Sequence, residues 1–352
     1  MNYYFLDKIS WPLSQALYHA AAYLQHESLF ILRPESPYVC IGFHQDAEQE
    51  IDLNFTAQNN IPVYRREVGG GAVYLDGQQL FYQLIINTNN PHIPQAKEEI
   101  YRQLLNPVVE TYREFGVDAA YKPVNDIIAN GKKVSGNGAA EINNMVVLVG
   151  NFILDFDYDT MSKCLRVPDE KFRDKVFKTL QENLSTFLRE TGQKPDTRSL
   201  GDSLAKRYEK IFGKMEWKTE VEDDLLQKAD ELHKERFADD WLYFNDRRRP
   251  TARSVKIRDG VNVIQNLIKT PGGLVRVTLV NDNGILRDVH ISGDFFFYPS
   301  EKLTDLEKAL DGIPYNEEMI HQKVESFYLD KNIEAPGVNP IDIAKAIVPL
   351  VS

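Results

Sequence analysis

Apolar residues in the first half of the chain recur in short runs bounded by Gly, Pro, Asn or Ser, a pattern that predicts strands. The run at residues 3–6 is predicted as an edge strand, and the run at residues 80–86 is continuous enough to predict a strand covered on both faces. The remaining runs lie at residues 29–32, 38–41, 61–64 and 145–154.

Two segments in this half instead repeat their apolar residues every three or four positions. Residues 13–24 and 100–115 each have this spacing, which predicts helices with one buried face. Ser10 is a candidate cap for the first helix, and Pro12 is tolerated in a first turn. Gly116 follows the second helix as a suitable C-terminal cap.

The second half of the chain changes character twice. Residues 155–236 are polar with helical spacing, and residues 221–236 indicate a charged surface helix. Strands are then predicted at residues 260–265, 273–280 and 285–292, and helices at residues 304–310, 317–328 and 341–351. Strands with a few interleaved helices and hairpins favour an α+β fold over a doubly wound parallel sheet.

The length of 352 residues indicates one large domain and a smaller one. We place the boundary where Arg247, Arg248 and Arg249 precede Pro250, which predicts domains at 1–248 and 249–352. The arginines are interpreted as a solvated linker, with docking of an acidic protein partner as the alternative.

Composition and charge limit the possible functions. A hydrophobic content of 43% is ordinary for a soluble globular protein, and a net charge of -11 argues against nucleic-acid binding. An anionic ligand therefore needs a local basic pocket. Cys40 and Cys164 give neither a disulfide framework nor a metal-site spacing. The first residues lack a signal-peptide pattern, and the longest apolar run, at 145–149, is too short to span a bilayer, so we expect a cytoplasmic protein with no membrane partner.

Two arginines and a run of glycines form the first candidate for chemistry. Arg65 and Arg66 lie just before Gly69, Gly70 and Gly71. Consecutive glycines are costly to order, and a ligand lying directly against the backbone would explain them. Guanidinium groups beside such a loop pair well with phosphate or carboxylate. The alternative is a flexible turn with solvated arginines.

A predicted hairpin forms the second candidate. Asn130-Gly131 is a strong two-residue turn signal between two strand-like runs. Strand alternation places Lys133 and Ser135 on one face and Lys132 on the other.

Together these two stretches resemble the lipoate–protein ligase A family, within the wider group of biotin and lipoate ligases. The family pattern has two arginines, three glycines, Ala-Val and an aromatic residue, then Asn-Asp, and later Lys-Val-Ser-Gly. The matching residues here are Arg65, Arg66, Gly69, Gly70, Gly71, Ala72, Val73, Tyr74, Asn125, Asp126, Lys133, Val134, Ser135 and Gly136. Gly293-Asp294-Phe295-Phe296 also resembles the accessory C-terminal domain of bacterial lipoate ligases.

The resemblance implies an α+β fold: a large biotin/lipoate-ligase-like (class II synthetase-like) domain with a mixed sheet, and a small α+β C-terminal domain. It implies ATP-dependent activation of lipoate, or octanoate, to an acyl adenylate. Transfer to a lysine of a lipoyl-acceptor domain would follow, on a 2-oxoacid dehydrogenase E2 subunit or the glycine-cleavage H protein.

The resemblance also implies residue roles. Lys133 would be catalytic, bridging the α-phosphate and the acyl carbonyl, and Asp126 would hold Mg²⁺, with turn capping as its alternative. ATP and the adenylate would contact the matching residues above and Asn137, while Gly42, Gln45 and Gly150 would line the lipoate pocket. Gln45 could instead cap a turn. Ser185 and Thr186 are weaker candidates for contact with the ligand.

The sequence departs from the family at Val68, at Leu75, and at Val149-Gly150-Asn151, where the family has Ser or Thr, His, and His-Gly-Thr. These departures bear on the acyl substrate. The alternatives are an octanoyl- or lipoyltransferase acting through a cysteine thioester, a biotin–protein ligase, and a non-catalytic acyl-binding protein. Neither Cys40 nor Cys164 lies in a sequence context that would activate its thiol.

Overall fold

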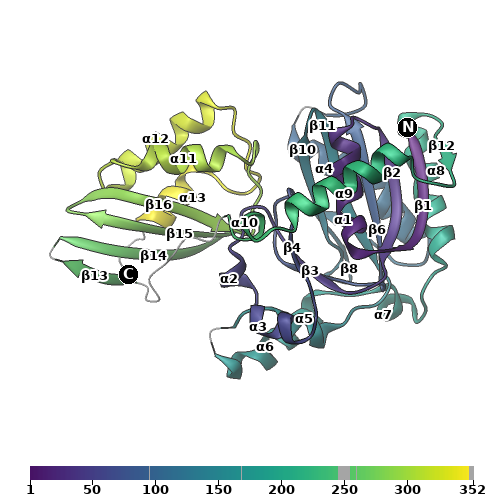
Figure 1. Cartoon of the computed structure of the whole chain (residues 1–352), viewed down its shortest axis with the longest axis horizontal. Helices are drawn as coiled ribbons and strands as arrows, with labels where there is room; N and C mark the ends of the chain where they lie inside the picture. The colour runs from purple at the N-terminus through teal and green to yellow at the C-terminus, as the bar shows by residue number, and fades with distance from the viewer. Residues whose placement is uncertain (95, 168, 245–253, 259, 349–352) are drawn as a thin grey trace. The chain divides into compact units, whose positions relative to one another are not determined.

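The computed structural model describes residues 1–94, 96–167, 169–244, 254–258 and 260–348, which form two compact units (Figure 1). The large unit comprises Met1–Cys40, Glu50–Arg66 and Val73–Leu242. The small unit comprises Ile41–Gln49, Glu67–Ala72 and the described residues after 242. The predicted boundary at 248/249 and the Arg247–Arg249 linker lie outside the described residues.

A six-stranded mixed sheet forms the centre of the large unit, in the order β10-β11-β6-β2-β1-β12. Its strands are β1 (Asn2–Ile9), β2 (Ser28–Pro34), β6 (Gln79–Asn87), β10 (Asn137–Ile142), β11 (Met145–Ile153) and β12 (Glu216–Lys218). β1 runs parallel to β2 and β12, and the remaining pairs are antiparallel. The predicted α+β class with a mixed sheet is confirmed.

The prediction that residues 3–6 form an edge strand is wrong. These residues lie within β1, and the three-residue β12 pairs alongside it through Asn2↔Glu216 and Tyr4↔Lys218. β12 has no apolar run and comes more than 200 residues later, so local sequence patterns give no sign of it.

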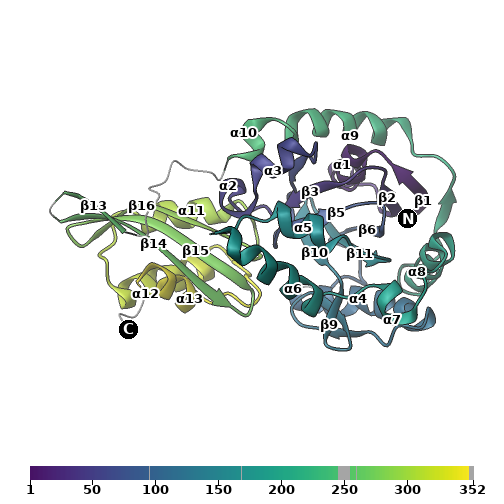
Figure 2. The same ribbon diagram turned by 90° about the horizontal axis from the view of Figure 1, so that it is seen from below.

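Helices cover both faces of this sheet (Figure 2). α1 (Trp11–Tyr23) and α9 (Asp223–Arg236) lie on one face, and α4 (Lys97–Glu114) and α8 (Thr197–Phe212) on the other. Fully buried Leu84 on β6 belongs to the same apolar cluster as Leu104 on α4 and Leu204 on α8. Each such side chain contributes about 1.5–3 kcal/mol of hydrophobic stabilisation. β6 is buried along nearly its whole length, as its continuous apolar run predicts.

The helix ends agree in part with the sequence. Pro12 lies in the first turn of α1 and Gly116, at φ +87°, follows the end of α4, both as predicted. Ser10 precedes α1, but its side chain makes no capping hydrogen bond. Its backbone carbonyl instead accepts from the N–H of Ser14 at 3.0 Å, so the predicted side-chain cap is wrong.

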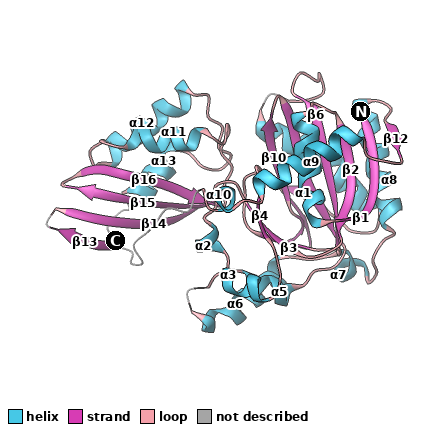
Figure 3. Ribbon diagram, viewed as in Figure 1, coloured by secondary structure: helices cyan, strands magenta, loops and turns pink. Residues whose placement is uncertain are grey.

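Two three-stranded sheets and several short helices complete the large unit (Figure 3). One sheet has the order β4-β3-β5 and the other β7-β8-β9. Their strands are β3 (Tyr38–Ile41), β4 (Val63–Arg65), β5 (Val73–Leu75), β7 (Ala120–Lys122), β8 (Asp126–Ala129) and β9 (Lys132–Ser135). The short helices are α3 (Leu53–Gln58), α5 (Tyr158–Cys164), η1 (Glu170–Phe172), α6 (Arg173–Asn183), α7 (Phe187–Thr191) and α10 (Asp239–Leu242), whereas α2 (Ala47–Glu50) belongs almost entirely to the small unit.

An antiparallel sheet of order β13-β14-β15-β16 and three helices form most of the small unit. The strands are β13 (Ser254–Arg258), β14 (Val261–Thr270), β15 (Gly273–Asp282) and β16 (Ile285–Gly293), and the helices are α11 (Lys302–Leu310), α12 (Glu317–Asp330) and α13 (Pro340–Ile347). Asn283 and Gly284, both at positive φ, connect β15 to β16, in the interval between the strands predicted at residues 273–280 and 285–292. Among the described helices of both units, none is long and apolar enough to cross a membrane.

Candidate active site

The predicted hairpin is confirmed as β8 and β9. Asn130 and Gly131 have φ values of 49° and 76°, as a two-residue turn between twisted strands requires. Ala129 pairs with Lys132 and Ile128 with Lys133, and the register then shifts next to Ile127. The hairpin therefore fixes the backbone of Lys132 and Lys133.

Lys133 forms an ion pair with Asp126 across this hairpin. The distance from Lys133 Nζ to Asp126 Oδ1 is 2.7 Å, and the two side chains are 37% and 31% exposed. A pair this exposed contributes only about 0–1 kcal/mol, so a phosphate or a cation could replace either partner at small cost. Lys132 instead donates from Nζ to the Gln181 carbonyl at 3.2 Å. The two lysines thus have separate partners.

A buried polar network lies next to the Lys133 strand. Ser135 is fully buried, and its hydroxyl donates to the Asn151 carbonyl at 2.7 Å. The Asn151 side chain accepts from the N–H of Gly136 at 2.8 Å and donates to Gln79 Oε1 at 2.7 Å. Gln79 in turn donates to the Tyr74 carbonyl at 2.9 Å. Fully satisfied buried networks of this kind hold a backbone in one geometry.

Asn125 and Asn137 extend the network through reciprocal side-chain contacts. The Asn137 amide donates to the Asn125 carbonyl at 2.8 Å, and the Asn125 amide donates to the Asn137 carbonyl. Tyr82 donates its hydroxyl to Asn137 Oδ1. A Cβ added at Gly150 would lie 2.3 Å from both Asn137 Oδ1 and the Tyr82 hydroxyl. Gly150 is thus required for this packing, whatever its role in an acyl pocket.

Sequence reasoning missed Gln79 and Tyr82 as members of the site, and it named Asn151 only as a departure from the family pattern. Each is a polar residue in an otherwise apolar buried strand, and that anomaly was the available signal. Burial raises the pKa of the Tyr82 hydroxyl well above its usual value, so Tyr82 remains a hydrogen-bond donor at neutral pH.

The two predicted phosphate-binding arginines differ in environment. Arg65 is fully buried, and its guanidinium donates to the Leu242 carbonyl through Nε at 3.0 Å and Nη2 at 2.5 Å. Trp241 donates from Nε1 to the Arg65 carbonyl at 2.9 Å. Arg66 is half-buried and donates from Nη1 to the Cys40 carbonyl at 3.2 Å. Arg65 therefore has a structural task at α10, and phosphate contact by either arginine stays a prediction.

Within the small unit, the glycine stretch packs against its own chain. A Cβ added at Gly42 would lie 1.8 Å from the Gly70 carbonyl oxygen, and Gly70 has φ +91°. The N–H of Phe43 donates to the Val68 carbonyl at 3.1 Å. Gln45 accepts from the N–H of Gly42 at 2.9 Å, which is the turn-capping role left open for it by the sequence.

The other side of the glycine stretch is occupied by residues that follow β16. A Cβ at Gly69 would lie 2.8 Å from the Phe295 carbonyl oxygen, and a Cβ at Gly71 would lie 3.5 Å from Asp294 Cβ. The N–H of Gly70 donates to that same Phe295 carbonyl at 3.3 Å. Ala72, next in the chain, is half-buried. Close chain packing at Gly69 and the positive φ of Gly70 therefore explain these two glycines, independently of any ligand.

The remaining predicted contacts lie on β5, where Val73 pairs with Cys40, Tyr74 with Val39 and Leu75 with Tyr38. Leu75, one of the departures from the family pattern, is buried in this sheet.

Both cysteines are buried and poorly suited to nucleophilic chemistry. Burial, with a smaller contribution from nearby Asp157, raises the pKa of the Cys164 thiol to about 12. Burial also raises the pKa of Cys40, against the opposing effect of Arg66. The thiolate is the reactive form, so both side chains remain protonated and unreactive near neutral pH.

Ser185 and Thr186 have structural contacts next to the hairpin. The N–H of Ser185 donates to the Lys133 carbonyl at 2.8 Å, and the Thr186 hydroxyl caps α7 by accepting from the N–H of Arg189 at 3.2 Å. Both residues are buried. Their observed role is to hold the backbone, and ligand contact stays a prediction.

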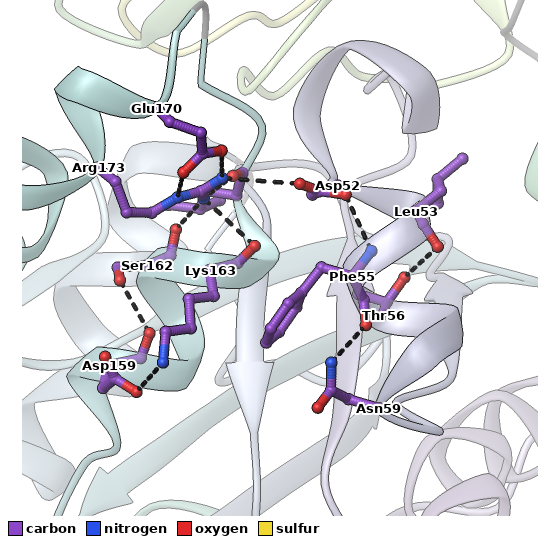
Figure 4. Close-up of polar contacts among 11 residues, drawn as sticks. Asp52, Leu53, Phe55, Thr56, Asn59, Asp159, Ser162, Lys163, Glu170 and Arg173 are labelled. Carbon is purple, nitrogen blue, oxygen red and sulfur yellow. Dashed lines mark hydrogen bonds and ion pairs between the residues drawn. The ribbon is translucent and has the colours of Figure 1, made fainter.

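The helices that lead to Ser185 are anchored by Arg173, at the start of α6 (Figure 4). Its Nη1 donates to the Ser162 and Leu165 carbonyls at 2.5 and 2.6 Å, and its Nη2 lies 2.6 Å from a Glu170 carboxylate oxygen. Asp52, which caps α3, lies 3.6 Å away. One arginine thus joins α3, α5 and α6.

No group of three or more His, Cys, Asp or Glu side chains could hold a metal ion within the described ranges. Mg²⁺ bound to a nucleotide needs only one or two carboxylates, because phosphates and water fill the other positions. The half-exposed Asp126 carboxylate fits that requirement.

Two parts of the chain match models of known protein families. Residues 8–209 match the family model of the lipoyl protein ligase A/B catalytic domain, and residues 263–347 match the bacterial lipoate protein ligase C-terminus. The chain is 26% identical over 306 residues to lipoate–protein ligase 1 of Staphylococcus aureus, covering 86% of each chain. It is 22% identical over 231 residues to octanoyltransferase LipM of Kyrpidia tusciae, covering 59% of this chain and 84% of the relative.

Two solved structures share the fold. An archaeal bipartite lipoate protein ligase from Thermoplasma acidophilum, solved in work that includes its E2 lipoyl domain, gives a TM-score of 0.62 at 23% identity, with 71% of this chain and 98% of that chain covered. A lipoate-protein ligase A bound with ATP gives 0.58 at 22% identity, with coverage of 69% and 98%. Because the catalytic-domain model alone covers more than half of the residues, the chain belongs to the lipoyl protein ligase A/B family.

Proposed function

We propose that this enzyme is an ATP-dependent lipoate–protein ligase, which forms lipoyl-AMP and transfers the lipoyl group to a lysine of an acceptor domain. Relatives named lipoate–protein ligase and the match to a ligase C-terminal region support the proposal. The fold is shared with a ligase bound with ATP, which supports ATP as the co-substrate. It is also shared with a ligase studied with its E2 lipoyl domain, which supports a lipoyl domain as the acceptor.

In the first half-reaction, a carboxylate oxygen of lipoate attacks the α-phosphorus of ATP. The bond from that phosphorus to the bridging oxygen breaks, and pyrophosphate leaves with the electron pair. Negative charge builds up on the α-phosphate oxygens, and the Lys133 ammonium is the cation that stabilises it. Lys133 is suited to this task because a hydrogen bond from the Ser185 N–H holds its backbone carbonyl. Its half-exposed ammonium forms only a weak ion pair with Asp126, which it can give up to contact the phosphate.

In the second half-reaction, the neutral amine of the acceptor lysine attacks the carbonyl carbon of lipoyl-AMP. The bond between the acyl carbon and the phosphate oxygen breaks, AMP leaves, and the amine loses a proton to solvent. The same Lys133 charge would stabilise the oxygen anion of the tetrahedral intermediate.

Asp126 would hold Mg²⁺, which supplies neutralisation of phosphate charge. Asp126 would then exchange its ion pair with Lys133 for the cation, leaving the lysine for the α-phosphate. Arg66 would contact the phosphates, and backbone N–H groups near Gly71 the adenylate. In this proposal residues 1–248 form the catalytic domain and residues 249–352 an accessory domain that acts as a lid.

The state of the two cysteines favours the ligase over the transferase suggested by relatives such as LipM. Acyl transfer without ATP through a thioester needs an activated thiol. The raised pKa values of Cys40 and Cys164 oppose that chemistry. The choice of the ligase over the transferase therefore rests on these two buried thiols.

The test is mass-spectrometric detection of an acylated acceptor domain, with and without ATP, for the parent and for Cys40→Ala and Cys164→Ala. We expect lipoylation only with ATP and in all three proteins. Octanoyl transfer from an acyl carrier without ATP, abolished by one cysteine substitution in a folded protein, would establish the transferase instead. Modification with biotin would support the biotin ligase. No modification with any of the acids would support the non-catalytic acyl-binding protein.

A further inference from the structure

The strand that carries Lys133 lies at a sheet edge, where its position depends on residues outside the sheet. β9 is the outer strand of the order β7-β8-β9. On its outer side, Lys133 forms a parallel bridge with Leu184, through the hydrogen bond from the Ser185 N–H to the Lys133 carbonyl. The segment from Gln181 to Glu190, whose residues 184–186 lie between α6 and α7, therefore contacts the edge of β9 at this bridge.

One carboxylate connects this segment to the hairpin at a second point. Glu190 Oε2 accepts from the side-chain amide of Asn130, in the hairpin turn, at 2.6 Å. Glu190 Oε1 accepts from the hydroxyl of buried Ser185. The same carboxylate thus binds the turn of the hairpin and the residue that binds the Lys133 carbonyl.

The segment is itself held in place at both ends. Arg189 Nη1 lies within 3.0 Å of the Gln181 and Leu184 carbonyls and of the Tyr158 hydroxyl. Arg173 anchors the opposite end of α6 to α5, as Figure 4 shows. A contact to this segment therefore restrains the hairpin against a fixed body.

We infer that Glu190, acting through Ser185 and Asn130, is a positioning residue for the Lys133 ammonium. The inference rests on the proposed function, because it gives Lys133 its role in adenylation. Glu190 binds the turn and Ser185 binds β9 three residues further on, so loss of the carboxylate lets the strand tilt about its edge. A tilt moves the end of the long lysine side chain more than it moves the backbone.

The prediction for Glu190→Ala is a single-turnover rate of acyl-AMP formation about 10- to 100-fold lower, the scale expected when a catalytic group is misplaced. KM for ATP should not change, because Lys133 acts mainly in the transition state. The matched control is Glu182→Ala, which removes an exposed carboxylate from α6 and should keep the parent rate.

A charge swap tests the geometry. Glu190→Gln leaves one acceptor oxygen for the two donors Asn130 and Ser185, and in Asn130→Asp two carboxylates face each other, so each single change should slow the reaction. Combining Asn130→Asp with Glu190→Gln restores a donor–acceptor pair while leaving an oxygen for Ser185, and the rate should recover. Position 130 has φ 49°, which Asp tolerates.

A double-mutant cycle separates positioning from a general structural role. In the Lys133→Ala background, Glu190→Ala should cause no further loss of rate. If the two losses multiply, or if the swap fails to restore the rate, the inference is overturned. Hydrogen–deuterium exchange of residues 130–135 gives a readout without catalysis, and it should rise in Glu190→Ala but not in Glu182→Ala. A parent that forms no acyl-AMP would overturn the proposed function, and unchanged exchange in Glu190→Ala would overturn the positioning role.

Discussion

The glycine stretch and the Lys133 hairpin both stand out in the sequence, but the structure gives them different physical explanations. Gly69 lies against the Phe295 backbone, Gly42 lies against Gly70, and Gly70 has φ +91°, so close packing and backbone conformation within the small unit already favour glycine there. The hairpin in the large unit instead has a buried, hydrogen-bonded framework next to the half-exposed Lys133 ammonium. A motif that is costly to fold thus does not by itself indicate a ligand, whereas a rigid framework around an exposed charge is a stronger indication.

The largest expected effect is at the hairpin. Lys133→Ala should lower single-turnover acyl-AMP formation by about 100- to 1,000-fold, the scale for loss of one transition-state donor. Lys133→Arg should fail nearly as badly, because a planar fork does not replace a compact ammonium. Lys132→Ala, which loses only the Gln181 contact, is the matched control and should cost little. Greater damage from Lys132→Ala would reverse our assignment of the two lysines.

Gly42→Ala tests the packing explanation for the glycine stretch. The added methyl group would overlap the Gly70 carbonyl, so we expect a loss of about 1–3 kcal/mol in unfolding free energy, the usual range for overpacking. Chemical denaturation measures this change. Parent-like stability in Gly42→Ala would mean that the close approach is not required.

Arg66→Ala should weaken ATP binding by roughly 2 kcal/mol, about 30-fold in Kd, through loss of a charge-assisted contact. Isothermal titration calorimetry with ATP measures it, and Arg102→Ala on the exposed face of α4 is the control. Arg65→Ala should mainly reduce stability, since Arg65 holds the Leu242 carbonyl in the interior. An ATP affinity equal to that of the parent would remove Arg66 from the site.

The smallest effect should come from the hairpin glycine. A Cβ at Gly131 meets no atom within 4 Å, so Gly131→Ala costs only the strain of a residue at φ +76°, about 1–2 kcal/mol. Its unfolding free energy, measured beside that of Gly42→Ala, separates strain from overlap. An equal or greater loss in Gly131→Ala would contradict the contrast between the two regions.

Local patterns were enough to predict much of the fold, because apolar runs and turn residues act over short distances. Asn130-Gly131, Gly116 and the buried run of β6 have the predicted structures. Long-range pairing was not predictable in the same way: β12 covers β1 from more than 200 residues away, and the partner of Gly69 is Phe295.

The candidate site was predicted to a similar extent. The Lys133–Asp126 pair joins two residues singled out from the sequence. Gln79 was missed, and Asn151 was noted only as a departure from the family pattern, because their importance comes from a network that joins β6, β11 and the hairpin. Arg65 was expected at phosphate, but its burial against Leu242 depends on a segment 177 residues later.

The most direct test of adenylation is lipoate-dependent exchange of labelled pyrophosphate into ATP by the purified protein. The account predicts exchange that requires lipoate and Mg²⁺, is retained in Lys132→Ala and is lost in Lys133→Ala. No exchange with lipoate, octanoate or biotin, in a folded parent protein, would contradict it.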